Sequence, residues 1–226
     1  MLEFFVRGGP VMWPLLFTSL VAATFLLYKA VFWLRVGAGR DREFVARFLR
    51  LVEEGKYSEA AERARASRDF VVRILHSGLV HRNYSAPEAL RMAAEEALGR
   101  MRRYHTVLDT VVTVAPLLGI LGTVMGIIQS FGLLSDAGQA DPRAATQGMA
   151  AALITTAAGL MIAIPTLVFA NYFGRVTEHA AQEIETEATC LEICLARNAA
   201  HGIGEAAGPG TEAPAPVRAG GPGAGR

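Results

Sequence analysis

The chain has 226 residues, of which 52% are hydrophobic and 19% charged, and its mean hydropathy is +0.30. Between residues 110 and 174 the only charged side chains are Asp136, Asp141 and Arg143, so two long uncharged segments flank a short polar link. A soluble core rarely needs two such runs, which argues against a single soluble globular enzyme and for a membrane protein. The net charge of +1 gives no reason to expect nucleic acid as a partner.

The first apolar run covers residues 11–34 and follows a short N-terminal segment, residues 1–10. At about 1.5 Å per residue it is long enough to cross a hydrocarbon core of about 30 Å. Its one charged residue is Lys29, which can snorkel towards the nearer membrane surface. The segment lacks the basic start and the small-residue cleavage site of a signal peptide, so we expect a retained transmembrane helix.

The loop that follows, residues 35–109, is predicted to be a cytoplasmic helical domain. Residues 35–104 carry 15 Lys and Arg against 10 Asp and Glu, and the positive-inside rule therefore places the loop in the cytoplasm and the N-terminus in the periplasm. Apolar residues recur at helical spacing from Phe44 to Val52. A capping box at residues 85–88 (Ser-Ala-Pro-Glu) begins a further helix, which we expect to run unbroken into the second span.

Two more spans are predicted, over residues 110–134 and 144–174, with a periplasmic link at 135–143. Three crossings return the C-terminus to the cytoplasm, where an apolar stripe among charges predicts a helix over residues 175–201. From Gly202 the composition changes to Gly, Ala and Pro, which predicts a disordered tail over residues 202–226. The predicted fold class is therefore an all-α integral membrane protein, with three transmembrane helices and long cytoplasmic helical extensions.

The second and third spans each carry small and polar residues on one helical face. They are Gly119, Gly122, Thr123, Gly126 and Ser130 in the second span, and Gly148, Ala152, Thr155, Thr156, Gly159, Ala163 and Thr166 in the third. Small residues let helix backbones approach closely in lipid, so the first interpretation of these stripes is helix packing. The hydroxyl groups can bond across helices, or only to carbonyl groups of their own helices.

Pro116 and Pro165 lie inside these two spans, and each leaves the carbonyl group four residues earlier without its usual donor. In lipid such a carbonyl group must face protein, a side chain or water. Two interpretations stay open: a tolerated kink, or helices of a bundle beside a wet path.

Neither of these spans has an ionisable side chain in its core, although proton relays in membranes normally use one. If the protein conducts ions, hydroxyl groups line its share of the route and another chain supplies the carboxylate. Because the sequence contains no hydrolase, zinc-protease or phosphate-loop motif, we predict neither enzymatic activity nor a metal or other cofactor. Cys190 and Cys194 are interpreted as small helix residues in a reducing compartment.

Residues 115–128 (APLLGILGTVMGII) and residues 152–165 (ALITTAAGLMIAIP) closely resemble the signatures of the ExbB/TolQ/MotA family of ion-channel subunits. Three spans with one large cytoplasmic loop resemble the ExbB/TolQ branch, because the flagellar MotA branch has four spans. In this resemblance Thr123 and Thr156 match the pore-lining threonines of the family, and Thr155 adds a second hydroxyl group beside Thr156.

The resemblance implies a homo-oligomer in membrane lipid, a pentamer in this family, that encloses the single transmembrane helices of an ExbD/TolR-like partner. The aspartate of that partner would carry the ion, which fits the missing carboxylate here. We therefore expect a channel subunit of a proton-motive-force-driven motor in the cell inner membrane, which energises an envelope protein of TonB or TolA type.

The sequence departs from the family at Ala151, five residues before Thr156, where several members have Glu and where Gln147 is a weak polar substitute. The proton is the expected ion, and sodium stays open because paired threonines also occur in some sodium-using relatives. Two other interpretations remain: a non-conducting membrane scaffold whose stripes serve packing alone, and a sodium-driven or motility-type stator of the same family.

Overall fold

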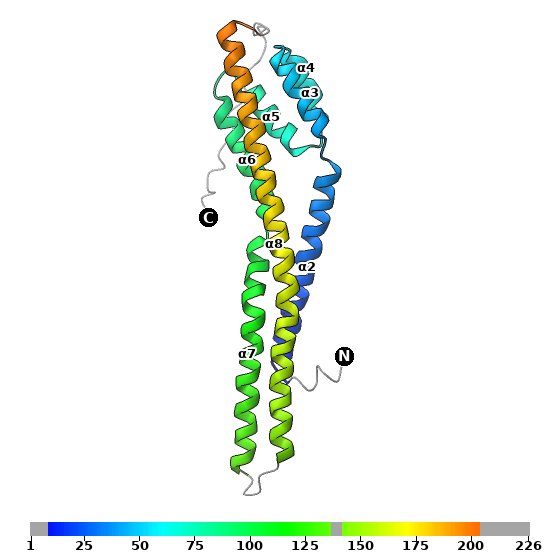
Figure 1. Cartoon of the computed structure of the whole chain (residues 1–226), viewed down its shortest axis with the longest axis vertical. Coiled ribbons are helices and arrows are strands. Elements are labelled where there is room, and N and C mark those ends of the chain that lie inside the picture. Colours follow the sequence, from blue (N-terminus) through cyan, green and yellow to red (C-terminus); the bar gives the residue numbers. More distant parts are fainter. Residues whose placement is uncertain (1–8, 137–141, 204–226) are drawn as a thin grey trace, which may run out of the picture.

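A computed structural model describes residues 9–136 and 142–203, and these form seven helices with no strand among them (Figure 1). In chain order they are α2 (Met12–Ala38), α3 (Arg42–Glu53), α4 (Tyr57–Arg65), α5 (Phe70–Val80), α6 (Ala86–Arg102), α7 (His105–Asp136) and α8 (Pro142–His201). Most of the predicted N-terminal segment, part of the predicted link at 135–143 and nearly all of the predicted tail lie outside the described residues.

Three long helices form the lower half of the molecule in Figure 1. Helices α7 and α8 run side by side in opposite directions, and α2 packs against both. Three helical stretches are long and apolar enough to cross a membrane: Met12–Ala38, Ala86–Phe131 and Gly148–His201. The prediction of an all-helical chain with three membrane-length apolar helices is confirmed.

Helix α8 continues without a break through Pro165 and on past its apolar stretch to His201. Its 60 residues correspond to about 90 Å at about 1.5 Å per residue, which is far more than a membrane span requires. The continuous helix therefore reaches from the lower end of the molecule into the group of helices at the upper end, as its apolar stripe predicted.

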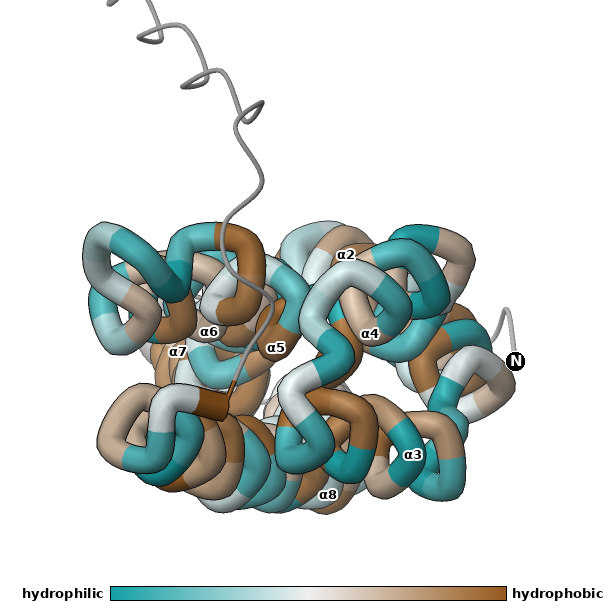
Figure 2. Tube along the Cα trace, turned by 90° about the horizontal axis from the view of Figure 1, so that it is seen from above, coloured by the Kyte–Doolittle hydropathy of each residue, from teal (hydrophilic) through white to brown (hydrophobic). Residues whose placement is uncertain are grey.

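Helices α3, α5 and α6 pack against the second half of α8, and α4 packs on α3 and α5. We call α3–α6 together with residues 177–201 the head. Its core is apolar and draws on every helix of the head, with Phe48 of α3, Ala60 of α4, Leu75 of α5, Leu90 of α6 and Leu191 of α8. Seen from above in Figure 2, each helix at this end carries both hydrophilic and hydrophobic stretches. This mixture is typical of amphipathic helices that bury one face and expose the other to water.

The prediction that α6 runs unbroken into the second span is wrong. Helix α6 ends at Arg102 and α7 begins at His105, and between them Tyr104 adopts a left-handed backbone conformation with φ 61°. Its ring packs against Phe25 and Tyr28 of α2, with centroids 5.0 and 5.3 Å away. No Gly or Pro marks this position, so the aromatic contacts with α2 favour a break that the local sequence does not predict.

The prediction that Lys29 snorkels to the membrane surface is also wrong. The residue is only 2% exposed, and its Nζ lies 3.4 Å from the carbonyl oxygen of Met101 and 3.3 Å from Nδ1 of His105. The α6–α7 break frees a carbonyl group at the end of α6, and the lysine donates to it instead of reaching water.

Candidate functional site

The two spans that carry the family-like motifs touch along their backbones. A Cβ atom placed on Gly159 of α8 would lie 2.5 Å from the carbonyl oxygen of Ala115 on α7. One placed on Gly119 of α7 would lie 3.0 Å from Cα of Thr156. Neither distance leaves room for a methyl group without backbone movement, so these glycines set how closely α7 and α8 approach.

Two further glycines of α7 continue this contact towards the lower end of the molecule. A Cβ atom on Gly126 would lie 2.9 Å from the carbonyl oxygen of Gly148, and one on Gly122 would overlap the side chain of Thr155. The small-residue stripes of the two spans therefore face each other within one chain. Packing of this kind is typical of helices in lipid, where apolar burial gives no advantage over contact with acyl chains.

The three threonines predicted to line an ion pathway differ in their position at this contact. Thr155 is 1% exposed, and its hydroxyl group donates to the carbonyl oxygen of Ala152 at 2.8 Å and lies 3.4 Å from that of Gly119. Thr156 is half-buried and donates across to the carbonyl oxygen of Gly119 at 3.1 Å. Thr155 therefore lies inside the α7–α8 contact and Thr156 at its edge.

Thr123 is half-buried on α7, and its hydroxyl group donates to the carbonyl oxygen of Ile120, in the same helix, at 2.6 Å. This is the local bond that threonines commonly make in membrane helices. A second chain can reach the half-buried Thr123 and Thr156, whereas Thr155 is covered by its own chain. The role of all three residues in ion movement stays a prediction.

Helices α7 and α8 continue without a break through Pro116 and Pro165. Pro116 is half-buried in α7 and Pro165 is exposed in α8. The carbonyl groups of Val112 and Met161 therefore lack the backbone donor that another residue would supply. The choice between a tolerated kink and a wet path stays open at both positions.

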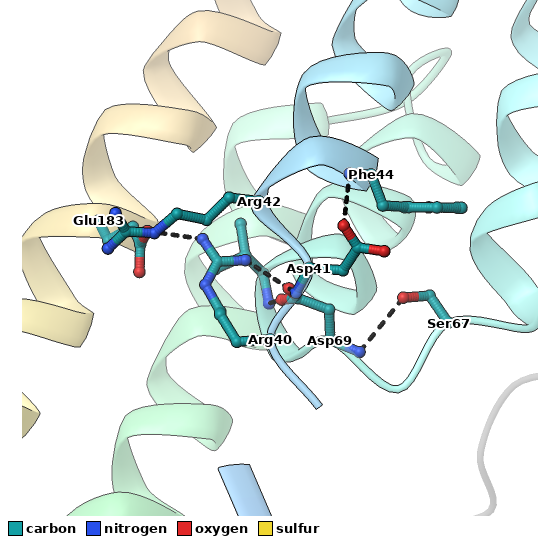
Figure 3. Close-up of polar contacts among 8 residues, drawn as sticks. Arg40, Asp41, Arg42, Phe44, Ser67, Asp69 and Glu183 are labelled. Carbon is teal, nitrogen blue, oxygen red and sulfur yellow. Dashed lines mark hydrogen bonds and ion pairs between the residues drawn. The ribbon is translucent and has the colours of Figure 1, made fainter. Parts of the chain in front are cut away.

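A polar network, which sequence reasoning missed, connects the end of α2 to the head (Figure 3). Arg40 donates to the carboxylates of Asp69 and Glu183, the latter at 2.6 Å. Burial lowers the pKa of Arg40, but the bonds to Glu183 and Asp69 outweigh burial and raise the pKa above its usual value. The guanidinium group thus remains charged and joins α2, α5 and α8.

Asp69 is the centre of this network, because its carboxylate is fully buried and accepts from several donors. Besides Arg40, it receives the backbone N–H groups of Val71 and Asp41, each at 2.8 Å. It also caps the N-terminus of α5, while Asp41 caps α3 by accepting from the N–H group of Phe44 at 2.9 Å. The sequence signal was two Asp residues that each directly precede a helix with apolar residues at helical spacing, and such residues are typical N-caps.

A second group that sequence reasoning missed lies at the start of α7. His105 is between Lys29 of α2 and Asp109 of its own helix, with its Nε2 3.9 Å from Oδ1 of Asp109. The signal that could have indicated it is Lys29 itself, because a charged residue inside a span usually has a partner within the protein.

Comparison with known proteins shows the family to which the chain belongs. Residues 65–186 match the MotA/TolQ/ExbB proton channel family. ExbB-like 1 of Synechocystis sp. is 40% identical over 176 residues, which are 74% of this chain and 68% of that protein. The biopolymer transport protein exbB1 of Vibrio cholerae is 25% identical over 194 residues, 83% of this chain and 85% of that protein.

The three membrane-length helices and this family match together define a helical membrane protein of a proton-channel family. The chain belongs to the MotA/TolQ/ExbB proton channel family. The resemblance that the two span motifs indicated is confirmed.

Proposed function

We propose that this chain is the channel subunit of a proton-motive-force-driven motor of the ExbB/TolQ type. One observation carries the proposal: Thr123 and Thr156 are half-buried, and residues 110–134 and 144–174 contain no Asp, Glu, Lys, Arg or His. Proton relays within membranes normally use a titratable group. These spans supply hydroxyl groups, and a second chain has to supply the carboxylate.

The proposed assembly is a homopentamer around single-span helices of an ExbD/TolR-like protein, whose aspartate carries the proton. Its output is movement or force delivered to a TonB- or TolA-like envelope protein. Family membership supports this proposal, as does the similarity to exbB1 of Vibrio cholerae, a biopolymer transport protein. The accessible threonines also fit a route that is completed between chains.

The proposed orientation places the N-terminus in the periplasm and the head in the cytoplasm of a cell with an inner membrane. The excess of Lys and Arg over residues 35–104 supports it through the positive-inside rule. An odd number of spans then puts the end of α8 on the cytoplasmic side.

The variant Thr156→Val tests the ion-path role. Valine keeps the shape of the side chain but removes the hydroxyl group, so we expect assembly to persist while ion-driven work is abolished. Thr156→Ser, which keeps the hydroxyl group, should retain most of the activity. The measurement is complementation of a strain that lacks the chain, together with the amount of complex recovered from membranes.

Thr24→Val is the matched control, because Thr24 is an exposed threonine of α2 whose hydroxyl group donates to Leu20 within its own helix. It should behave like the unchanged chain. Full activity of the Thr156→Val variant would contradict the role of Thr156 in the ion path. It would favour the alternative of a non-conducting scaffold, in which the stripes of small residues serve packing alone.

A further inference from the structure

Lys29 is an unusual residue for its position, because it is a buried cation in the first span. An ammonium group can only donate hydrogen bonds, and burial away from water is costly unless acceptors surround it. Its acceptors are the carbonyl oxygen of Met101 at 3.4 Å and Nδ1 of His105 at 3.3 Å, and the ring of Phe173 lies 5.9 Å away. None of these partners is a carboxylate.

The contact with Met101 places the lysine at the C-terminus of α6. The last carbonyl groups of a helix have no partner within it, and a cation there is favourable because the helix dipole is negative at that end. Two aromatic residues of α2 pack on the ring of Tyr104 in the break. They are Phe25, one helical turn before Lys29, and Tyr28, the residue directly before it. One face of α2 therefore holds the whole α6–α7 break in place.

The contact with His105 makes this arrangement depend on a proton. Nδ1 can accept from an ammonium group only when the imidazole is neutral and carries its proton on Nε2. Nε2 lies on the side of Asp109, whose side chain is 59% exposed. A protonated imidazole would repel Lys29 and would gain an ion pair with Asp109.

His105 also has a neighbour on α8. On α8 the ring lies beside Gly174, where a Cβ atom would be 3.6 Å from Nε2, and Phe173 is the neighbouring apolar residue. Arg103, two residues before His105, has its guanidinium carbon 4.8 Å from the ring centroid of Tyr104. Among the described contacts of His105, the charged side chains are those of Lys29 and Asp109.

We propose that Lys29 and His105 form a proton-sensitive latch that fixes the head-facing end of α7. With His105 neutral, Lys29 bridges α6 and α7, and the break at Tyr104 is held against α2. With His105 protonated, the imidazolium turns to Asp109 and the bridge is released. Lys29 is a positioning residue in this account. The latch matters for ion flow only if α7 lines a channel, so in that respect it rests on the proposed function.

Hydrogen exchange of backbone amides 101–108 in the purified complex of this chain with its partner tests the latch. Rates are measured at about pH 7.5 and about pH 5.5, across the range in which imidazole titrates, and are corrected for intrinsic chemistry. We expect acid to raise the exchange rate of the unchanged chain at least about tenfold, the factor that matches loss of one charge-assisted hydrogen bond. Lys29→Met should exchange fast at both pH values.

His105→Asn is the decisive second variant, because its amide oxygen can replace Nδ1 as an acceptor but cannot be protonated. It should exchange slowly at both pH values. Arg102→Met, which removes an exposed cation from the last turn of α6, is the control and should follow the unchanged chain. The latch is overturned if the unchanged chain exchanges equally at both pH values, or if His105→Asn stays as acid-sensitive as the unchanged chain.

Ion flux through the same complex in liposomes separates the latch from the proposed function. We expect ion flux through the unchanged chain to depend on the pH at the head side. If His105→Asn still conducts but its flux no longer depends on that pH, the result supports both the latch and the channel proposal. An unchanged chain without flux would refute the channel proposal, whereas the exchange rates would still decide the latch. Flux with the same pH dependence in His105→Asn and in the unchanged chain would refute control by the latch.

Discussion

The absence of a Cβ atom at a few glycines sets how closely α7 and α8 approach, and Gly159 is the clearest example. A Cβ atom there would lie 2.5 Å from the carbonyl oxygen of Ala115, so Gly159→Ala has to push two backbones apart. We expect the variant to lower the free energy of unfolding by about 1–3 kcal/mol, the usual cost of overpacking. Denaturant titration of the protein in micelles measures this change.

Gly99→Ala is the matched control for that prediction. Gly99 is an exposed helical residue of α6 with no neighbouring atom within 4 Å of an added Cβ. Alanine should stabilise the protein there by about 0.5–1 kcal/mol, because glycine is a poor helix former. Equal stability of the Gly159→Ala and Gly99→Ala variants would contradict the close approach of α7 and α8.

The residues of this contact were partly predictable from the sequence. The spacing of an α-helix puts Gly119, Gly122 and Gly126 on one face whatever the surroundings, and the structure has all three against α8. The difference between Thr155 and Thr156 was not predictable. Neighbouring residues point about 100° apart on a helix, and which of them is covered depends on how α8 is rotated against α7.

At the scale of elements, the buried carboxylate of Asp69 joins the end of α2 to α3, α5 and, through Arg40, to α8 (Figure 3). Asp69→Ala leaves Arg40 and two backbone donors without this acceptor. We expect it to lower the free energy of unfolding by about 3–5 kcal/mol, as for other buried ion pairs that lose one partner. Limited proteolysis of the head and denaturant titration report the loss.

Glu54→Ala provides the comparison, since Glu54 pairs with Lys56 on the surface at 2.7 Å. Water screens such a pair, and its removal should leave both measurements close to those of the unchanged chain. A head equally resistant to protease in the Asp69→Ala variant would show that the network does not hold the head to α2.

Most elements could be predicted because their signals are local. Long uncharged runs indicate spans, and Asp41 and Asp69 stand directly before helices with apolar residues at helical spacing. The break between α6 and α7 has no such signal. It depends on Phe25, Tyr28 and Lys29, about 75 residues earlier in the chain, and only the packed structure brings them to Tyr104 and Met101.

At the scale of the whole molecule, the chain combines a closely packed pair of spans with a head that is built on one of the same helices. Because α8 is continuous from the membrane-length stretch into the head, a tilt of the α7–α8 pair moves the head with it. The charged residues of α7 and α8 lie outside residues 110–134 and 144–174, and within these two ranges the polar side chains include the hydroxyl groups of Thr123, Thr155 and Thr156. Such a distribution of charged residues and hydroxyl groups fits a channel subunit whose partner supplies the titratable group.

Proton flux in liposomes is the most direct test of that claim. The chain is reconstituted with its single-span partner, a pH gradient is applied, and the internal pH is followed. The account predicts flux that requires both proteins and that disappears when the partner's aspartate is replaced by Asn or when this chain carries Thr156→Val. Flux no greater than in protein-free liposomes, or equal flux from this chain alone, would contradict it.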